Sequence, residues 1–148
     1  MAYHRLFFSV FLTGAIMAVV PMVRAAEPLR FESPTPQQAA WLRTAPGGRT
    51  ALALADLNED GLPEYIVQKD TQCAAQKALC DFEILADSGK GTISLGHLRA
   101  YSLALGSSYV HNIRSLVAFR DPHDDYAAEV YVWDPAASRY MIQGQTTP

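Results

Sequence analysis

Alternation of apolar and polar positions is the main structural signal along the chain. In residues 80–87 (CDFEILAD), Phe82 and Ile84 alternate with acidic residues, which is the pattern of a strand with one buried face. Residues 99–108 are less regular and fit either a strand or a loop. Similar alternation, or a run of β-branched and aromatic residues, predicts further strands at residues 50–56, 64–68, 92–98, 113–120, 128–134 and 139–143.

One helix is predicted near the start of this pattern, at residues 35–43 (TPQQAAWLR). Thr35 is a suitable N-cap, Pro36 suits the first helical position, and Gln38 stands three residues after the cap. The segment APGG at residues 45–48 ends the helix. The predicted fold is therefore α+β or mainly β, a small antiparallel sheet of about six strands with one short N-terminal helix packed on a face.

The first 25 residues have the three-part pattern of a secretory signal peptide. A short basic start precedes an uncharged apolar run at residues 6–20, and small residues precede a cleavage point after Ala25 or Ala26. The alternative, an uncleaved membrane anchor, calls for a longer apolar run than this one. We therefore expect residues 26–148 to be one globular domain, periplasmic or secreted, with no membrane span after cleavage.

The charge of the predicted mature chain is acidic. The whole sequence has 12 Lys and Arg against 15 Asp and Glu, for a net charge of −3. Arg5 and Arg24 lie in the predicted leader, so the mature chain has a net charge of −5. This balance argues against nucleic acid or an anionic membrane as the main partner, and it is compatible with a basic protein partner.

Two cysteines, Cys73 and Cys80, lie close together in CAAQKALC. In an exported chain such a pair favours a structural disulfide that pins a loop between two strands. The alternatives are a redox pair or a metal site. The spacing differs from the C-x-x-C redox motif, and no histidine stands beside the pair.

The segment DLNEDGLPE, residues 56–64, has the oxygen spacing of a calcium loop. Its side-chain ligands would be Asp56, Asn58, Asp60 and Glu64, and the backbone carbonyl of Leu62 would supply another oxygen. An EF-hand would need a bidentate glutamate where the sequence has valine, at position 67, so that motif does not fit. The alternative is a purely polar turn, in which these side chains bind backbone N–H groups.

The same segment, D-x-N-x-D-G-x-x-E, resembles the calcium loops of FG-GAP and integrin-type β-propeller repeats. The order of features also resembles small exported bacterial proteins with a single such loop, followed by a cysteine pair and a closing hairpin that matches Trp133, Asp134 and Tyr140. The resemblance implies a calcium ion with a structural role. Because the motif occurs once and the chain has no repeats, a propeller fold and the cell-adhesion roles of the propellers are not expected.

Catalytic motifs are scarce. His97, His111 and His123 are scattered, and GSSY at residues 106–109 lacks the strand–turn–helix elbow that exposes a nucleophilic serine. We assign no catalytic residue, and the sequence favours a protein without enzymatic activity. A small hydrolase remains an alternative, with a His/Asp site that only the fold would assemble.

The leading functional hypothesis is an exported, non-enzymatic protein that binds another macromolecule. One form of it is an inhibitor or immunity protein against a cell-wall-degrading enzyme. The expected contact with a basic partner is the turn DPHDD and the residue after it, namely Asp124, Asp125 and Tyr126. The second hypothesis is a calcium-stabilised structural or adhesion accessory domain.

Overall fold

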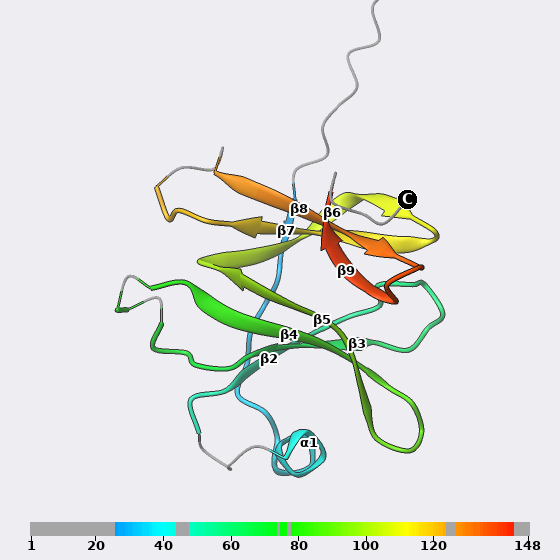
Figure 1. Cartoon of the computed structure of the whole chain (residues 1–148). Coiled ribbons are helices and arrows are strands. Elements are labelled where there is room, and N and C mark those ends of the chain that lie inside the picture. Colours follow the sequence, from blue (N-terminus) through cyan, green and yellow to red (C-terminus); the bar gives the residue numbers. More distant parts are fainter. Residues whose placement is uncertain (1–25, 44–47, 74, 77, 124–126, 144–148) are drawn as a thin grey trace, which may run out of the picture.

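The structure is a computed structural model, and it describes residues 26–43, 48–73, 75–76, 78–123 and 127–143. Within this part of the chain, no helix is long and apolar enough to cross a membrane. The described elements, shown in Figure 1, are β1 (Glu27–Pro28), α1 (Pro36–Leu42), β2 (Ala51–Ala55), β3 (Glu64–Gln68), β4 (Cys80–Asp87), β5 (Thr92–Ala100), β6 (Ser102–Val110), β7 (Ile113–Phe119), β8 (Ala128–Asp134) and β9 (Arg139–Ile142).

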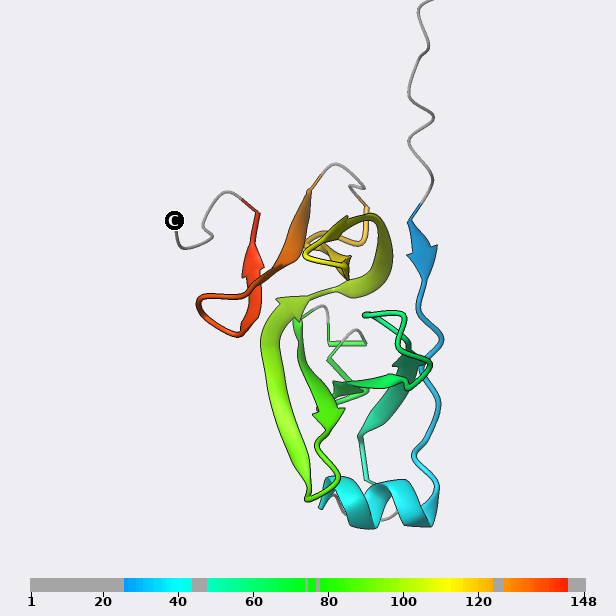
Figure 2. The same cartoon turned by 90° about the vertical axis from the view of Figure 1, so that its right-hand side faces the viewer.

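The strands form two antiparallel sheets, so the fold is mainly β and the prediction of a single sheet of about six strands is wrong. One sheet has the order β1-β6-β7-β8-β9 and the other the order β2-β3-β4-β5. Tyr101 alone separates β5 from β6, and the chain passes there from one sheet to the other. All of the ambiguous residues 99–108 except Tyr101 are therefore in strands. The two sheets lie one above the other (Figures 1 and 2).

The main core lies between the two sheets. Its large buried side chains come from both layers, for example Phe82 and Ile84 from β4 and Leu116 from β7. On β2 the small side chains of Ala53 and Ala55 face this core. Burying an apolar side chain of leucine or phenylalanine size contributes roughly 1.5–3 kcal/mol, so this layer of contacts is the principal stabilising feature of the fold.

The opposite face of the four-stranded sheet is covered in part by α1. Leu52, Val67 and Leu85 form a second buried cluster there, against which Leu42 of the helix and Tyr65 pack. The predicted capping box is confirmed, because Thr35 Oγ1 accepts a hydrogen bond from the N–H of Gln38 while Gln38 Oε1 accepts one from the N–H of Thr35. The helix seen at one end of the molecule in Figure 2 is thus set by its own sequence and held by a small apolar contact.

The segment at residues 27–32 links the free edges of the two sheets. Glu27 and Pro28 pair with Leu105 and Ala104 of β6, and Glu32 then exchanges two backbone hydrogen bonds of 2.9 and 2.8 Å with Leu52 of β2. On the other side, β5 and β9 approach so closely that a Cβ on Gly96 would lie 3.1 Å from Tyr140 Cβ. Both edges of the sandwich are therefore partly covered.

A tight contact between β6 and β7 requires glycine at position 106. A Cβ built on Gly106 would lie 2.1 Å from Ser115 Oγ, and Ser115 is itself buried and within 2.8 Å of Ser108 Oγ. The register of the two strands shifts in the same region, between Leu105 and Tyr109. A β-bulge here accommodates a buried serine pair, and that leaves no space for a side chain on residue 106.

We predict that Gly106→Ala lowers the free energy of unfolding by about 1–3 kcal/mol, because the new methyl group overpacks the Ser115 site. Thermal unfolding of the purified variant measures this loss. Gly96→Ala serves as the control, and its cost should be smaller because its nearest contact is 3.1 Å rather than 2.1 Å. A Gly106→Ala variant as stable as the parent would contradict the packing seen at this bulge.

Candidate functional site

The Asp-rich loop connects β2 to β3 and turns back on itself through its own side chains. Asp56 accepts hydrogen bonds from the N–H groups of Asp60 (3.2 Å) and Gly61 (2.9 Å). Asp60 accepts one from the N–H of Leu62 at 2.8 Å and another from the amide of Asn58 at 2.9 Å. Gly61 has φ of +87°, a left-handed conformation that glycine adopts without steric cost.

Leu57 fastens this loop to the interior of the protein. Its side chain is 1% exposed and belongs to the main core, although its neighbours in the sequence are polar. Its N–H donates to Glu64 Oε2 at 2.7 Å, and its carbonyl oxygen accepts from the N–H of Arg114 on β7 at 2.7 Å. The loop of the four-stranded sheet is therefore hydrogen-bonded to the five-stranded sheet.

Glu64 is the buried carboxylate of the loop, with 5% of its surface exposed. Burial raises the pKa of Glu64 above its usual value, backbone hydrogen bonds from Leu57 and from Glu64 itself lower it, and the nearby charges of Asp60 and Asp56 raise it further. Tyr140 lies close by and donates its hydroxyl hydrogen to the carbonyl of Arg114 at 2.8 Å. Burial, followed by the charge of Glu64, raises the pKa of Tyr140 as well.

The predicted calcium ligands lie in one loop, but the described side chains turn onto backbone amides. Oxygens of Asp56, Asn58, Asp60 and Glu64 each accept at least one backbone N–H hydrogen bond. In the part of the chain that the structure describes, no group of three or more His, Cys, Asp and Glu side chains is placed to hold a metal ion. The oxygen donors suit calcium chemically, while their arrangement is that of a hydrogen-bonded polar turn. Calcium binding stays a prediction.

The predicted disulfide between Cys73 and Cys80 is present, with the two Cα atoms 5.2 Å apart. Both cysteines are buried, and Gln68 Nε2 lies 3.3 Å from each sulfur. The bond joins the loop after β3 to the first residue of β4. Its burial within the core is typical of a structural disulfide.

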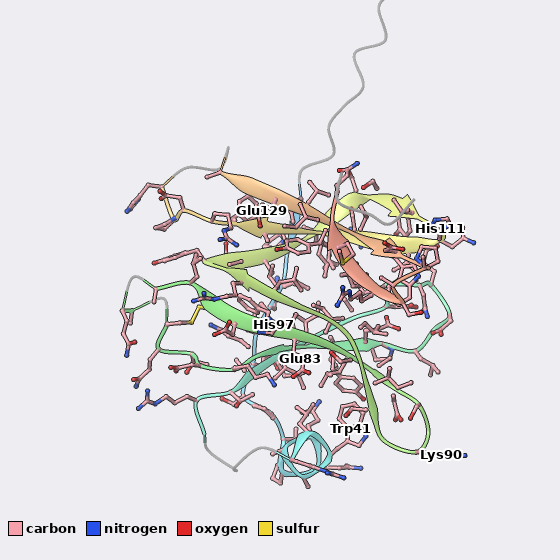
Figure 3. All side chains as sticks on the ribbon, viewed as in Figure 1. Trp41, Glu83, Lys90, His97, His111 and Glu129 are labelled. Carbon is pink, nitrogen blue, oxygen red and sulfur yellow. A yellow bond between two sulfur atoms is a disulfide. The ribbon has the colours of Figure 1, made fainter. Side chains whose placement is uncertain are left out.

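The structure does not bring the candidate catalytic residues together. His111 precedes β7 and His123 follows it, and a seven-residue strand spans roughly 20 Å. His97 lies on β5, where its Nε2 is 3.5 Å from Asp81, and Figure 3 shows it far from His111. In the GSSY segment, Ser108 is hydrogen-bonded to Ser115. The predicted contact residues Asp124, Asp125 and Tyr126 lie outside the described residues.

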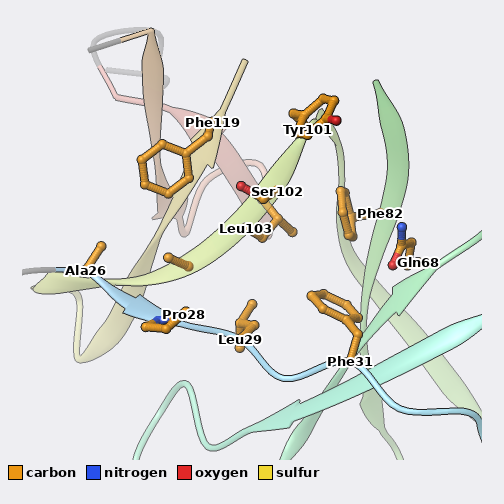
Figure 4. A pocket seen from close by; sticks show the side chains of 11 residues that line it. Ala26, Pro28, Leu29, Phe31, Gln68, Phe82, Tyr101, Ser102, Leu103 and Phe119 are labelled. Atoms are coloured by element: carbon orange, nitrogen blue, oxygen red, sulfur yellow. The ribbon is translucent and has the colours of Figure 1, made fainter. Parts of the chain in front are cut away.

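Two hollows that the sequence pattern did not predict are formed by residues from distant segments. The first has a volume of about 410 Å³ and lies where residues 27–32 cross between the sheets. Figure 4 shows four aromatic side chains around it, those of Phe31, Phe82, Tyr101 and Phe119. The second lies around Trp41, between α1 and the β4–β5 turn. The sequence signals that could have pointed to these hollows are the aromatic residues, Phe31, Tyr101 and Phe119 for the first and Trp41 for the second.

Comparisons with protein-family models, with curated proteins and with solved structures give no match. The resemblance of residues 56–64 to FG-GAP loops therefore stands on that motif and on the order of features described above.

We predict that Glu64→Gln stabilises the protein at pH 7 when a chelator is present. The pKa of Glu64 is higher in the folded state than its ordinary value of 4.5, so the ionised carboxylate lowers the free energy of unfolding at neutral pH. Protonation of Glu64 restores this stability as the pH falls through the folded-state pKa toward the ordinary value. The advantage of glutamine should therefore shrink over this interval. Urea unfolding at several pH values measures it.

Two further variants complete this experiment. Glu64→Ala removes the acceptor for the Leu57 N–H and should destabilise the fold by about 1–3 kcal/mol, because that donor is buried. Glu59→Gln changes an exposed carboxylate of the same loop and should alter stability by less than about 0.5 kcal/mol. If Glu64→Gln is destabilising at every pH, the ionised carboxylate is a net stabilising group and our interpretation is wrong.

Proposed function

We propose that this chain is an exported, non-enzymatic protein that binds another macromolecule through its Asp-rich loop. Its specific form would be an inhibitor or immunity protein against a cell-wall-degrading enzyme. The buried disulfide is compatible with an exported location. The single observation that carries the proposal is the exposure of Leu62 on a loop whose backbone is fixed from within.

Leu62 is 69% exposed, the largest value among the exposed large hydrophobic residues of the described chain. The residues around it are held by hydrogen bonds to Asp56 and Asp60, and the base of the loop is held by Leu57. A loop that is ordered before binding loses little conformational entropy when it docks, so more of its contact energy becomes affinity. An exposed leucine at such a place is a suitable anchor for an apolar pocket of a partner.

The charges around this anchor indicate the kind of partner. Asp56, Glu59 and Asp60 are exposed on the same loop as Leu62, so the loop presents carboxylates together with an apolar tip. Such a surface complements a cleft with an apolar floor and a basic rim, and charge complementarity of this kind speeds association and selects the partner. A contact by Asp124, Asp125 and Tyr126 stays a prediction, because these residues lie outside the described chain.

The experiment tests purified cell-wall hydrolases of three classes, a muramidase, an amidase and an endopeptidase. Each is assayed by the clearing of a cell-wall suspension with and without the protein. We expect inhibition of one class, and we expect Leu62→Ala to weaken that inhibition at least about tenfold, as for an interface anchor residue. Ile93→Ala is the matched control, because Ile93 is 52% exposed but lies on β5 and not on the loop. This variant should inhibit the enzyme as strongly as the parent protein does.

Two results would contradict the proposal. If none of the three classes is inhibited, the proposed inhibitor role is wrong. If one class is inhibited but Leu62→Ala and Ile93→Ala behave alike, the protein is an inhibitor that uses another surface. Circular dichroism of both variants verifies that neither substitution changes the fold.

The second candidate is a calcium-stabilised structural domain, favoured by the carboxylates of Asp56, Asp60 and Glu64 in one short loop. Burial is the main cause that raises the pKa of Glu64, and the charges of Asp60 and Asp56 raise it further. A bound cation would offset this repulsion. The residues proposed to hold the ion are Asp56, Asn58, Asp60, the Leu62 carbonyl and Glu64. To bind calcium, some of these side-chain oxygens would have to give up the hydrogen bonds that they now accept from backbone N–H groups.

If the loop binds calcium, we expect the melting temperature to rise when calcium replaces chelator. Free calcium at a hundredfold excess over its dissociation constant adds about 2.7 kcal/mol by mass action. For a domain of this size the shift is on the order of 5 to 15 °C. Magnesium should do much less, because it tolerates flexible cages of many oxygens poorly.

Asp60→Ala should abolish the calcium shift while leaving the calcium-free protein folded, since it removes a ligand and also relieves repulsion. Glu59→Ala, at an exposed residue of the same loop that is not a predicted ligand, is the control and should keep the shift. Differential scanning calorimetry measures all of these values. Equal melting temperatures in millimolar calcium and in chelator would leave the loop as a polar turn only.

A further inference from the structure

A groove runs between α1 and the β4–β5 hairpin, on the far side of the four-stranded sheet from the main core. It consists of two neighbouring hollows of about 650 and 430 Å³, and both are lined by Trp41 and Asp87. Figure 2 shows the helix beside the tip of this hairpin, and Figure 3 shows Trp41 and Lys90 on the two facing elements. Each volume falls in the range of about 300–1,000 Å³ that is common for small-molecule sites.

Trp41 is the central aromatic side chain of this groove. Its ring contacts Tyr65 at a centroid distance of 4.4 Å and a tilt of 43°, which fixes its orientation on the sheet. The side chain is only half-buried and contributes to both hollows. The face of an indole ring is electron-rich, and the C–H bonds on one face of a pyranose ring are positively polarised, so sugars stack on such rings.

Two polar side chains of the groove are held in place while part of each stays open to a ligand. Asp87 Oδ1 accepts a hydrogen bond from the N–H of Gly89 at 2.7 Å, and Gln38 Oε1 is used in the capping box with Thr35. Within the described chain, no hydrogen bond occupies Asp87 Oδ2 or Gln38 Nε2. A carboxylate oxygen accepts from a sugar hydroxyl and an amide N–H donates to one, so together they match the two roles of a hydroxyl group.

Cations distinguish the larger hollow from the smaller one. Arg43 and Lys90 line it from the end of α1 and from the hairpin turn, and Asp87 is its one carboxylate among the lining residues. Among the described residues, neither Arg43 nor Lys90 forms an ion pair. Their charges are therefore available to an acidic ligand, and charge-assisted hydrogen bonds to a carboxylate are among the strong ones.

We propose that this groove binds a short glycan that carries a carboxylate, with one sugar ring stacked on Trp41 and the carboxylate directed to Arg43 and Lys90. Cell-wall glycan has this chemistry, because alternate sugars bear a lactyl carboxylate. The site uses none of the residues of the Asp-rich loop, so it is independent of the enzyme-binding function proposed above. It would place the protein on the wall polymer itself.

The test titrates the purified, isotope-labelled protein with three probes and follows the indole N–H and backbone resonances by NMR. The probes are the N-acetylglucosaminyl–N-acetylmuramic acid disaccharide, chitobiose, which lacks the carboxylate, and lactate, which lacks the sugar. We expect the acidic disaccharide to shift the Trp41 indole signal with a dissociation constant of about 1 mM or below, and the other two probes to bind at least about tenfold more weakly.

Variants connect the binding to the named residues. Lys90→Glu changes an exposed turn residue. It should weaken binding of the acidic disaccharide at least about tenfold and leave the affinity for chitobiose unchanged. Trp41→Ala should abolish binding of both sugars, and Tyr109→Ala, an exposed aromatic residue on β6, is the matched control that should bind like the parent. Since Trp41→Ala also removes the contact with Tyr65, Lys90→Glu tests the site if that variant fails to fold.

Three outcomes would overturn the proposal. No shift of the Trp41 signal with either sugar would mean that the ring serves only to pack the helix on the sheet. Equal affinity for chitobiose and the acidic disaccharide would remove the role of Arg43 and Lys90. Binding of lactate as tight as that of the acidic disaccharide would mean a general anion site without glycan recognition.

Discussion

Leu57 connects the Asp-rich loop to both sheets through its buried side chain and its two backbone hydrogen bonds. Its side chain lies in the core between the sheets, its N–H is satisfied by Glu64 and its carbonyl by Arg114. A buried backbone group without a partner would cost roughly 1–3 kcal/mol, so both hydrogen bonds lower the free-energy cost of burying this residue. The loop conformation and the stacking of the sheets are thus parts of one structure.

This anchoring explains why one loop can be both internally tight and exposed at its tip. Glu64 is buried and accepts a hydrogen bond from the N–H of Leu57, while Leu62, which follows the left-handed Gly61, is exposed. Burial raises the pKa of this carboxylate, and the nearby charges of Asp60 and Asp56 raise it further. The order of the loop, the repulsion among its carboxylates and the exposure of Leu62 therefore belong to one conformation of the loop.

The same sandwich presents two different recesses at its margins. The aromatic hollow beside Phe31 and Phe119 lies where the N-terminal segment crosses from one sheet edge to the other. The groove around Trp41 exists because α1 covers only part of the outer face of the four-stranded sheet, and the β4–β5 turn stands beside it. Each recess is a place where secondary-structure elements meet without filling the space between them.

The sequence by itself determined the features that depend on near neighbours in the chain. These include the capping box of Thr35 and Gln38, the Cys73–Cys80 disulfide, most of the strands and the hydrogen-bonded turn at Gly61. Propensity, period and short loop closure decide such features, and all of them can be read within a window of about ten residues. Alternation along β2 predicts a strand, but it does not decide that Ala53 and Ala55 face the main core and Leu52 the smaller cluster.

Only the tertiary structure decided which strands share a sheet and which side chains meet. A single residue, Tyr101, separates strands of different sheets, and nothing local distinguishes that junction from an irregular stretch of one strand. Within its polar loop, Leu57 is a core residue because the opposing sheet packs on it and the N–H of Arg114 binds its carbonyl. A His/Asp site could only have been assembled by the fold, and the fold instead places strand β7 between His111 and His123. The reason is that long-range pairing between sheets and loops depends on contacts among residues far apart in the chain, which periodicity does not encode.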